Sequence, residues 1–137
     1  MNALSPAEIV QKMMDHDAFS QWLGLEVLEI GAGHCRLKMT VRPEMVNGFG
    51  ISHGGITFSF ADSAFAFASN SRGQHAVSIE TGISHISPVY PGDNLIASAT
   101  ELQNGKRLAR YEVIVKREEE PVALFKGTVY KKDQPWI

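Results

Sequence analysis

The sequence contains a single cysteine, Cys35, and no long apolar run. One thiol excludes a disulfide within the chain, which suits a reducing cytoplasm. No stretch offers the roughly 20 apolar residues that a membrane helix needs. Residues 1–17 also lack the basic start and the apolar run of an export signal. We therefore expect a cytoplasmic protein without a membrane partner.

The net charge is also small: 13 lysines and arginines nearly balance 15 aspartates and glutamates, which leaves a net charge of -2. This balance gives no general attraction for nucleic acid or for an anionic membrane surface. The histidines show neither an i, i+4 pair nor clustering with the cysteine at metal-ligand spacing, so we expect surface or packed histidines and no metal site. Basic residues gather late in the chain, which leaves room for a local site that binds a phosphorylated ligand.

The length of the chain fits one domain. With 137 residues it can bury about two thirds of the surface of its unfolded form, which is enough for a full core. No repeat, low-complexity run or linker divides it. We expect residues 1–137 to form a single domain.

Apolar and polar residues alternate in a pattern that predicts six strands. In residues 34–42 the alternation is typical of a half-exposed antiparallel strand, and residues 25–30 precede it as its partner. Four more strands are expected at residues 75–87, 94–102, 107–117 and 121–132. Turn signals separate them at Pro91-Gly92-Asp93, Asn104-Gly105 and Glu120-Pro121. A short helix is expected over Pro6–Asp15, with Ser5 as its cap.

Residues 55–70 predict a central helix that is apolar over about two thirds of its circumference. Such a helix must be wrapped, and the antiparallel sheet is the only wrapping that this chain offers. The remaining arc carries small or polar residues: Ser59, Asp62, Ser63, Ala66, Ser69 and Asn70. We expect this stripe to face outward, toward a partner or a cavity, with Asp62 as its one carboxylate.

The stretch GISHGG at residues 50–55 has two chemical interpretations. As G-x-S-x-G it would make Ser52 a nucleophile on a strained strand-to-helix turn. That turn requires a buried strand before it, but the preceding RPEMVNGFG is typical of a loop. As a His-Gly-Gly turn that opens the helix, the stretch offers free backbone N–H groups that can hold negative charge. The second interpretation is favoured.

Asp62 lies too far along the helix to act together with this turn in one chain. At the rise of an α-helix, Gly54 and Asp62 are roughly 12 Å apart along the axis. Two antiparallel central helices that face each other through their small-residue stripes would bring Gly54 of one chain toward Asp62 of the other. This geometry predicts a homodimer with shared active sites.

These features together resemble the hotdog-fold acyl-CoA thioesterases, and among them the PaaI-like group of phenylacetate degradation. The resemblance rests on NGFGISHGGITFSFADSAFAFASN, in which Asn47 precedes His53-Gly54-Gly55 and Asp62 follows it, and on SPVYPGD and VALFKG further along. It covers nearly the whole chain and implies an α+β hotdog fold, in which an antiparallel sheet wraps one long helix. It also implies a dimer that commonly pairs into a homotetramer.

The activity that this resemblance implies is the hydrolysis of acyl-CoA thioesters to free acid and CoA. Aromatic acyl groups of the phenylacetyl type are favoured by the same likeness. No metal or other cofactor is implied, because CoA is part of the substrate.

The resemblance also assigns roles to residues of the site. The Gly54 N–H would point at the thioester oxygen at the positive end of the helix, and Asn47 would bind the carbonyl or the lytic water. His53 would shape the loop and line the pocket, and it would not be the base. Asp62 of the partner chain would attack the carbonyl or deprotonate water, and the sequence leaves both open. The remaining predicted contacts are Gly55, Thr57 and Ser63.

The nucleotide end of CoA is expected on the protein surface. Our candidates for contacts with its phosphates come from the late basic residues: Lys106, Arg107 and Arg110. Two other functions stay open. A hotdog-fold hydratase of acyl thioesters is disfavoured, because the helix provides Asp62 without a nearby helical histidine. A non-catalytic acyl-CoA-binding protein is disfavoured, because it has no use for a carboxylate on the stripe.

Overall fold

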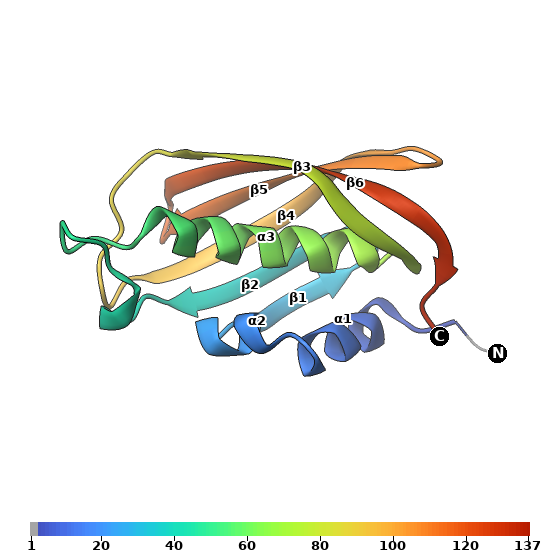
Figure 1. The fold of residues 1–137 in the computed structure, drawn as a ribbon, viewed down its shortest axis with the longest axis horizontal. Helices are drawn as coiled ribbons and strands as arrows, with labels where there is room; N and C mark the ends of the chain where they lie inside the picture. Colours follow the sequence, from blue (N-terminus) through green and yellow to red (C-terminus); the bar gives the residue numbers. More distant parts are fainter. Residues whose placement is uncertain (1–2) are drawn as a thin grey trace.

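The computed structural model describes residues 3–137 and shows one antiparallel sheet curved around a long helix (Figure 1). Its helices are α1 (Pro6–Asp15), α2 (Ala18–Leu23) and α3 (Gly54–Asn70), with a 3-10 turn, η1, at Pro43–Met45. Its strands are β1 (Glu26–Gly31), β2 (His34–Thr40), β3 (Gln74–His85), β4 (Asn94–Asn104), β5 (Leu108–Arg117) and β6 (Glu120–Pro135). The strand order is β1-β2-β4-β5-β6-β3, and every neighbouring pair is antiparallel. The predicted α+β hotdog fold is confirmed.

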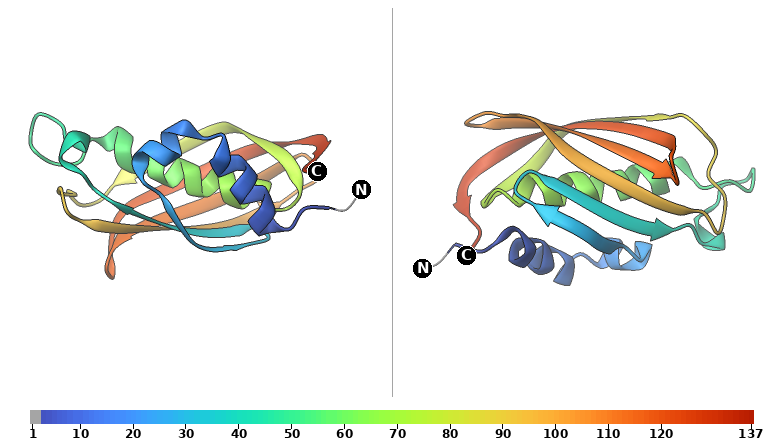
Figure 2. Two further views of the ribbon diagram at one scale, coloured as in Figure 1. Left: turned by 90° about the horizontal axis from the view of Figure 1, so that it is seen from below. Right: turned by 180° about the vertical axis from the view of Figure 1, so that it is seen from behind.

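The long helix α3 packs into the concave face of the sheet, as Figures 1 and 2 show from three sides. Its large apolar side chains are enclosed there, and Phe60 and Phe65 are at most 1% exposed. The Phe65 ring meets the Tyr111 ring of β5 edge-on, with 6.0 Å between their centroids. Gly127 of β6 completes the fit, because a Cβ atom at this position would lie 2.7 Å from the Phe65 ring. The sheet therefore wraps the helix closely, as its apolar circumference predicts.

The alternation of β2 is confirmed by the burial of its side chains. Cys35, Leu37 and Met39 are buried in the core, whereas Arg36 and Thr40 are exposed. Burial also raises the pKa of the Cys35 thiol to about 12. A thiol that stays protonated is a poor nucleophile, so Cys35 is a packing residue.

The N-terminal segment forms two helices where the sequence predicts one. In α1, Ser5 and Glu8 form a capping box, in which each side chain accepts the backbone N–H of the other. The next helix, α2, is capped by Asp17, whose carboxylate accepts the Ser20 N–H at 2.9 Å. It ends at Gly24, which has a left-handed φ of 75°. A helix of six residues is too short to show its apolar period, and its caps are the signal that could have revealed it.

The helices α1 and α2 lie alongside α3 next to β1, and this placement corrects the predicted stripe (Figure 1). Four positions stay at least partly exposed on the outward side of α3: Gly55, Ser59, Asp62 and Ala66. Three others are buried within the subunit: Ser63, Ser69 and Asn70. Ser63 Oγ lies 2.8 Å from Ser20 Oγ of α2, and the Asn70 side chain bonds both backbone groups of Ala76. The outward face is therefore narrower than the sequence predicts.

Two hairpin turns are displaced from their sequence signals. Between β4 and β5 the turn consists of Lys106 and Arg107, and the Gly105 N–H donates to the Leu108 carbonyl at 2.8 Å. Between β5 and β6 the turn is residues 118–119, so the predicted pair Glu120-Pro121 already belongs to β6. Both hairpins form as expected, and only the residues at their tips differ.

The strand β3 forms one edge of the sheet. Two of its apolar side chains, Val77 and Ile79, are 47% and 57% exposed. An edge strand with exposed apolar residues offers unpaired backbone groups to another chain. None of the helices within residues 3–137 combines the length and the apolarity that crossing a membrane requires.

Candidate active site

A hydrogen-bonded loop leads into α3. The Asn47 N–H donates to the Ile51 carbonyl at 2.8 Å, and the Asn47 side-chain oxygen accepts the Phe49 N–H at 2.9 Å. Gly50 suits this turn because its φ of 78° lies in the left-handed region, which glycine adopts without strain. The Asn47 side-chain nitrogen has no acceptor among residues 3–137, so its two N–H groups remain for a ligand.

Ser52 lacks the surroundings of a serine nucleophile. It forms an isolated bridge with Val46 and does not follow a buried strand. Its hydroxyl donates to the His53 carbonyl at 3.5 Å, and no histidine ring in the described chain hydrogen-bonds it. Both the platform and the general base of a nucleophile elbow are therefore missing at this position.

His53 caps the start of α3 with its ring. Its Nδ1 accepts the Gly55 N–H at 3.0 Å, and its carbonyl accepts the Ile56 N–H at 2.9 Å. Its own N–H donates to the Met45 carbonyl at 2.8 Å. The Gly54 N–H, between these donors, has no acceptor within residues 3–137. Gly54 therefore carries the free donor of this turn.

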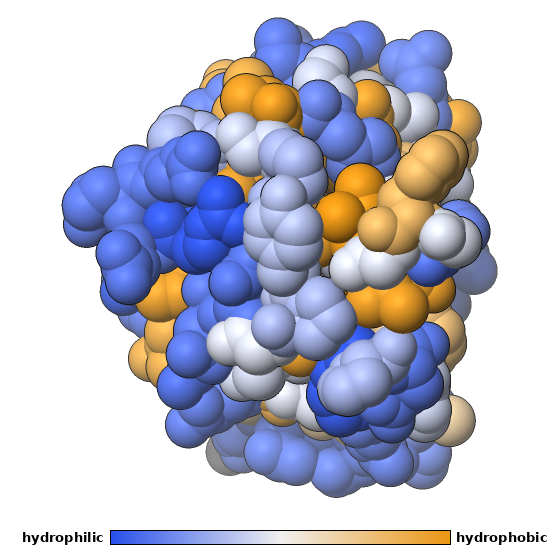
Figure 3. Space-filling model, turned by 90° about the vertical axis from the view of Figure 1, so that its left-hand side faces the viewer, coloured by the Kyte–Doolittle hydropathy of each residue, from blue (hydrophilic) through white to orange (hydrophobic). Residues whose placement is uncertain are grey.

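The position of this donor makes it suitable for a negatively charged oxygen. Gly54 is the first residue of α3, where the positive end of the helix dipole adds to the N–H itself. An oxyanion at this point gains both a hydrogen bond and a favourable field. Gly54 also lines a cavity of about 320 Å³, together with Asn47 and Thr57. Figure 3 shows the end of the molecule where α3 begins, with apolar patches among polar ones.

The cavity is also lined by His85, which is expected from the sequence to be only a surface or packed histidine. His85 comes from β3, and its ring lies against the start of α3. A Cβ atom on Gly54 would lie 3.2 Å from His85 Nε2, and His85 Nδ1 is 3.3 Å from Thr57 Oγ1. Thr57 Oγ1 donates in turn to the Gly54 carbonyl at 3.1 Å. Only the pairing of the strands around α3 brings this histidine to the turn, so no local motif could have revealed it.

Asp62 lies outside this cavity, on the outward side of α3. Desolvation raises the pKa of its carboxyl group, and the nearby carboxylate of Asp17 raises it further. Asp17 is fixed by Ser20, whose hydroxyl donates to it at 2.6 Å. With Gly54 roughly 12 Å away along the helix axis, the structure does not bring the two groups together within one subunit.

The outward side of α3 is hollowed next to the His-Gly-Gly turn. A second cavity, of about 390 Å³, is lined by His53, Gly55 and Ser59, together with Phe19 of α2. It is open, and its lining joins the apolar surface of α2 to the exposed positions of α3. The turn therefore separates two cavities, with Gly54 in one and its neighbours His53 and Gly55 in the other.

The basic candidates for phosphate binding lie far from the Gly54 cavity. Lys106 and Arg107 form the β4–β5 turn, and Arg110 follows in β5. The cavity is next to the other end of β5, where Arg117 donates to the Pro88 carbonyl at 3.0 Å. Ten residues of extended strand separate these ends by roughly 30 Å. The three side chains are therefore not part of the Gly54 site within one subunit.

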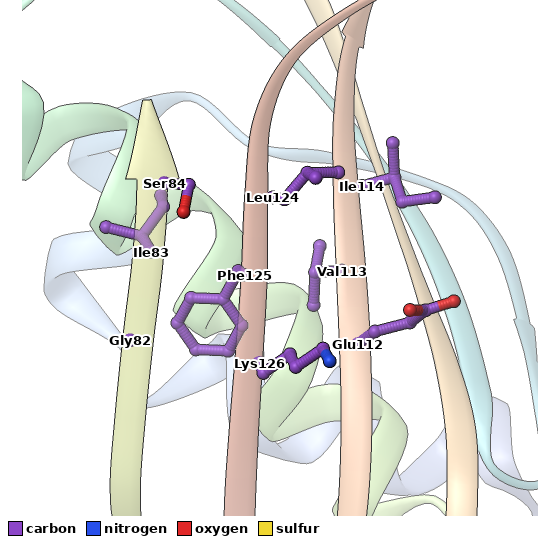
Figure 4. Close-up of a pocket in the computed structure, with 9 residues that line it drawn as sticks. All are labelled: Gly82, Ile83, Ser84, Glu112, Val113, Ile114, Leu124, Phe125 and Lys126. Carbon is purple, nitrogen blue, oxygen red and sulfur yellow. The ribbon is translucent and has the colours of Figure 1, made fainter. Parts of the chain in front are cut away.

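A larger hollow, of about 480 Å³, lies over the sheet and not at the start of α3 (Figure 4). Its lining comes from β3, β5 and β6, and Gly82 leaves it open because the space beside its Cα is empty. Glu112 and Lys126 are its charged residues. None of the residues predicted for the site lines it, so we place the candidate active site at the Gly54 cavity.

Comparison with known proteins connects this arrangement to a family. Residues 49–124 match the family model described as Thioesterase superfamily. The chain is 37% identical to a putative esterase of Archaeoglobus fulgidus over 133 residues, which cover 93% of this chain and 86% of that one. It is 38% identical to the acyl-coenzyme A thioesterase PaaI of Escherichia coli over 120 residues, 87% of this chain and 86% of that one. The solved structure of the E. coli PaaI protein from the phenylacetic acid degradation operon matches with a TM-score of 0.92 over 95% of both chains, at 33% identity.

We expect Asp62→Asn to stabilise the protein at neutral pH, and this gain to shrink as the pH falls. Because the pKa of Asp62 is raised in the fold, the native state binds this proton more tightly than the unfolded chain does. Stability is therefore lost as the pH rises from the unfolded pKa through the folded pKa, and the neutral amide avoids that loss. Thermal unfolding midpoints of both proteins, measured from acidic to neutral pH, test this.

The matched control is Asp15→Asn, at the exposed end of α1. It removes one negative charge from an exposed site, and the gain of Asp62→Asn at neutral pH should exceed its effect. A midpoint for Asp62→Asn at or below that of the unmodified protein at neutral pH would contradict the expectation.

Proposed function

The chain belongs to the thioesterase superfamily, and we propose that it hydrolyses acyl-CoA thioesters at an active site shared by two subunits. It is an acyl-CoA thioesterase with the hotdog fold, like PaaI of E. coli. The observation that carries the proposed site is the free N–H of Gly54, at the first position of α3 and beside a cavity.

Gly54 stabilises the charge that develops on the thioester oxygen. When the carbonyl carbon is attacked, its oxygen becomes negative, and a donor already in place stabilises this state more than the ground state. The Gly54 N–H needs no rearrangement to donate, because the other donors of the turn are already paired. Asn47 lines the same cavity, and its free side-chain N–H groups bind the carbonyl or the lytic water.

Asp62 of the second subunit provides the base or the nucleophile. A carboxyl group with a raised pKa holds a proton more readily, which favours its action as a general base toward water. Direct attack by the carboxylate on the carbonyl carbon uses the same placement, expels the CoA thiolate and forms an anhydride that water then hydrolyses. The proposal includes both routes, because each needs Asp62 near the carbon that Gly54 activates.

Three observations support the shared site. Gly54 and Asp62 are roughly 12 Å apart along one helix, so one thioester cannot contact both groups in one subunit. The exposed positions on the outward side of α3 are small, which allows a second helix to approach closely. The edge strand β3, with Val77 and Ile79 exposed, offers a surface where a second sheet can add.

The other predicted residues support these groups. His53 fixes the turn by accepting the Gly55 N–H, which agrees with a role in shaping the loop. Thr57 lines the cavity and anchors the carbonyl of Gly54. Ser63 is buried against Ser20 of α2, so we assign it to the surroundings of Asp62 and not to direct contact with the substrate.

For the acyl group we propose an aromatic, phenylacetyl-type structure. The E. coli PaaI protein comes from the phenylacetic acid degradation operon, and the likeness to it extends over 95% of both chains. The cavity next to Gly54 has an apolar side formed by Ile51, Ile86, Val89 and Val122. An apolar wall of this kind suits a ring more than a charged acyl group.

The proposal extends to the oligomeric state, the cofactor requirement and the contacts with the CoA phosphates. Residues 1–137 act as one domain in a cytoplasmic homodimer, which pairs again as a dimer of dimers. No cofactor is required beyond the CoA of the substrate, and no three potential metal ligands gather within residues 3–137. Lys106, Arg107 and Arg110 reach the CoA phosphates only from the partner subunit, because they are far from Gly54 in their own.

Two other activities are separated from hydrolysis by one assay. The nearness of His85 to Gly54 removes one reason against a hydratase, since an imidazole is present after all. A hydratase adds water to an unsaturated acyl chain and leaves the thioester bond intact. A binding protein changes neither the acyl chain nor the thioester bond. Release of free thiol from a panel of saturated acyl-CoA esters therefore identifies the hydrolase.

We expect Gly54→Pro to lower kcat by at least about a hundredfold, because removing one oxyanion donor typically costs that much. Proline suits the first position of a helix, and His53 before it already has the extended backbone that proline requires. The variant therefore removes the N–H with little change in the fold. Steady-state thiol release from phenylacetyl-CoA measures the effect.

Gly54→Ala is the matched control, because it adds a Cβ atom but keeps the N–H. Its Cβ atom lies 3.2 Å from His85, whose exposed ring can move slightly, so only a small loss is expected. Equal losses in the proline and alanine variants would show that space matters at this position and that the N–H does not.

We expect Asp62→Asn to lower kcat by at least about a hundredfold, because an amide is neither a base nor a nucleophile. The amide has nearly the same shape, so the fold and the dimer should persist, as circular dichroism and size-exclusion chromatography can verify. Ser52→Ala, beside the same turn, should change the rate little. Near-normal turnover by Asp62→Asn, or a collapse in Ser52→Ala, is the result that would overturn this mechanism.

A further inference from the structure

We propose that His85 is a further catalytic residue, the group that gives a proton to the sulfur of the departing CoA. This inference rests on the proposed hydrolysis at Gly54, and it adds an acid to a site where only a donor and a base have been assigned. Four features of the structure carry it: the distance to Gly54, the hydrogen bond to Thr57, the lining of the cavity and the exposure of the ring.

The ring of His85 is close to the atom that binds the thioester. His85 Nε2 lies 3.2 Å from the position of a Cβ atom on Gly54, which keeps it within about 6 Å of the Gly54 nitrogen. In a thioester the sulfur is bonded to the same carbon as the carbonyl oxygen. An oxygen on the Gly54 N–H therefore places the sulfur within reach of this ring.

Thr57 determines which ring nitrogen faces the substrate. In the proposal, the Thr57 hydroxyl donates its one proton to the Gly54 carbonyl, which lies 3.1 Å from Oγ1. Toward His85 Nδ1, at 3.3 Å, the hydroxyl can then only accept. Nδ1 therefore carries a proton in both states of the ring, and Nε2 is the nitrogen that gains or loses one.

His85 is the only ionisable side chain that lines this cavity in the described part of the chain. The positive end of α3 disfavours a second positive charge beside Gly54. Negative charge on the attacked thioester reverses this preference. The ring is exposed, so Nε2 can take one proton from the solvent, and the solvent receives in return the proton that is released from the lytic water.

The proton transfer completes the reaction without another reagent. When the carbonyl forms again, the bond between carbon and sulfur breaks and its electron pair moves to sulfur. The proton on Nε2 moves to that sulfur and yields the CoA thiol. His85 returns to its neutral form, with the proton on Nδ1 still donated to Thr57.

The test compares two leaving groups on one acyl group. Phenylacetyl-CoA releases an alkyl thiolate, which is a strong base and benefits from an acid. The S-phenyl thioester of phenylacetic acid releases thiophenolate, a much weaker base that leaves without one. We expect His85→Gln to lower kcat at least about tenfold with phenylacetyl-CoA and less than about twofold with the S-phenyl ester.

The matched control is His75→Gln, which changes the other histidine of β3. His75 stacks on Trp136 with 4.0 Å between the ring centroids and does not line the cavity. This variant should keep both rates. Thermal unfolding midpoints of both variants verify that they are folded.

A second variant tests the role of Thr57 as a positioning residue. Thr57→Val keeps the shape of this buried side chain but cannot accept from Nδ1. As with His85→Gln, kcat of Thr57→Val should fall more with phenylacetyl-CoA than with the S-phenyl ester. A structural defect would lower the rate of hydrolysis of both thioesters by the same factor.

Each outcome is decisive. A loss that is equal for both thioesters, or no loss in His85→Gln, overturns proton donation by His85 and leaves the hydrolase intact. Failure of the unmodified protein to release thiol from any acyl-CoA contradicts the proposed function, and this inference with it.

Discussion

The hydrogen bond from the Gly55 N–H to the ring of His53 fixes how α3 begins, and the rest of the site depends on it. A helix start exposes several N–H groups, and unpaired donors would compete for a substrate or bind water. Here His53 and Met45 pair with the neighbouring backbone groups, and the Gly54 N–H is left without an acceptor in the part of the chain that the structure describes. The loop bonds around Asn47 then hold the second donor of the site at the same cavity.

The wrapping of α3 decides where the carboxylate can be. A helix that is apolar over most of its surface must lie inside the curve of the sheet, and only one narrow side stays open. Asp62 is on that open side, half-buried beside α2, where desolvation raises its pKa without removing it from a partner's reach. One physical requirement, the burial of apolar surface, thus separates the donor from the base and makes a second subunit necessary in our proposal.

Much of this could be predicted from sequence, because local patterns carry it. The alternation of β2, the apolar circumference of α3 and the His-Gly-Gly turn are each visible in a short stretch, and all are confirmed as structural elements. Contacts between distant segments are not visible in this way. The short helix α2 shows no apolar period, so the sequence does not predict that α2 packs on Ser63. His85 lies beside Gly54 only because β3 pairs into the sheet that surrounds α3.

The most direct test of the shared site is the activity of mixed dimers. Gly54→Pro and Asp62→Asn subunits, each inactive as a homodimer, are mixed after reversible dissociation, and mass measurement verifies the heterodimer. If Gly54 of one chain acts with Asp62 of the other, each heterodimer has one intact site and activity returns. Mixing unmodified subunits with the double variant should then give inactive heterodimers, because every site has one lesion. The opposite pattern, an inactive first mixture and an active second heterodimer, would show that both groups act within one chain and would contradict the account.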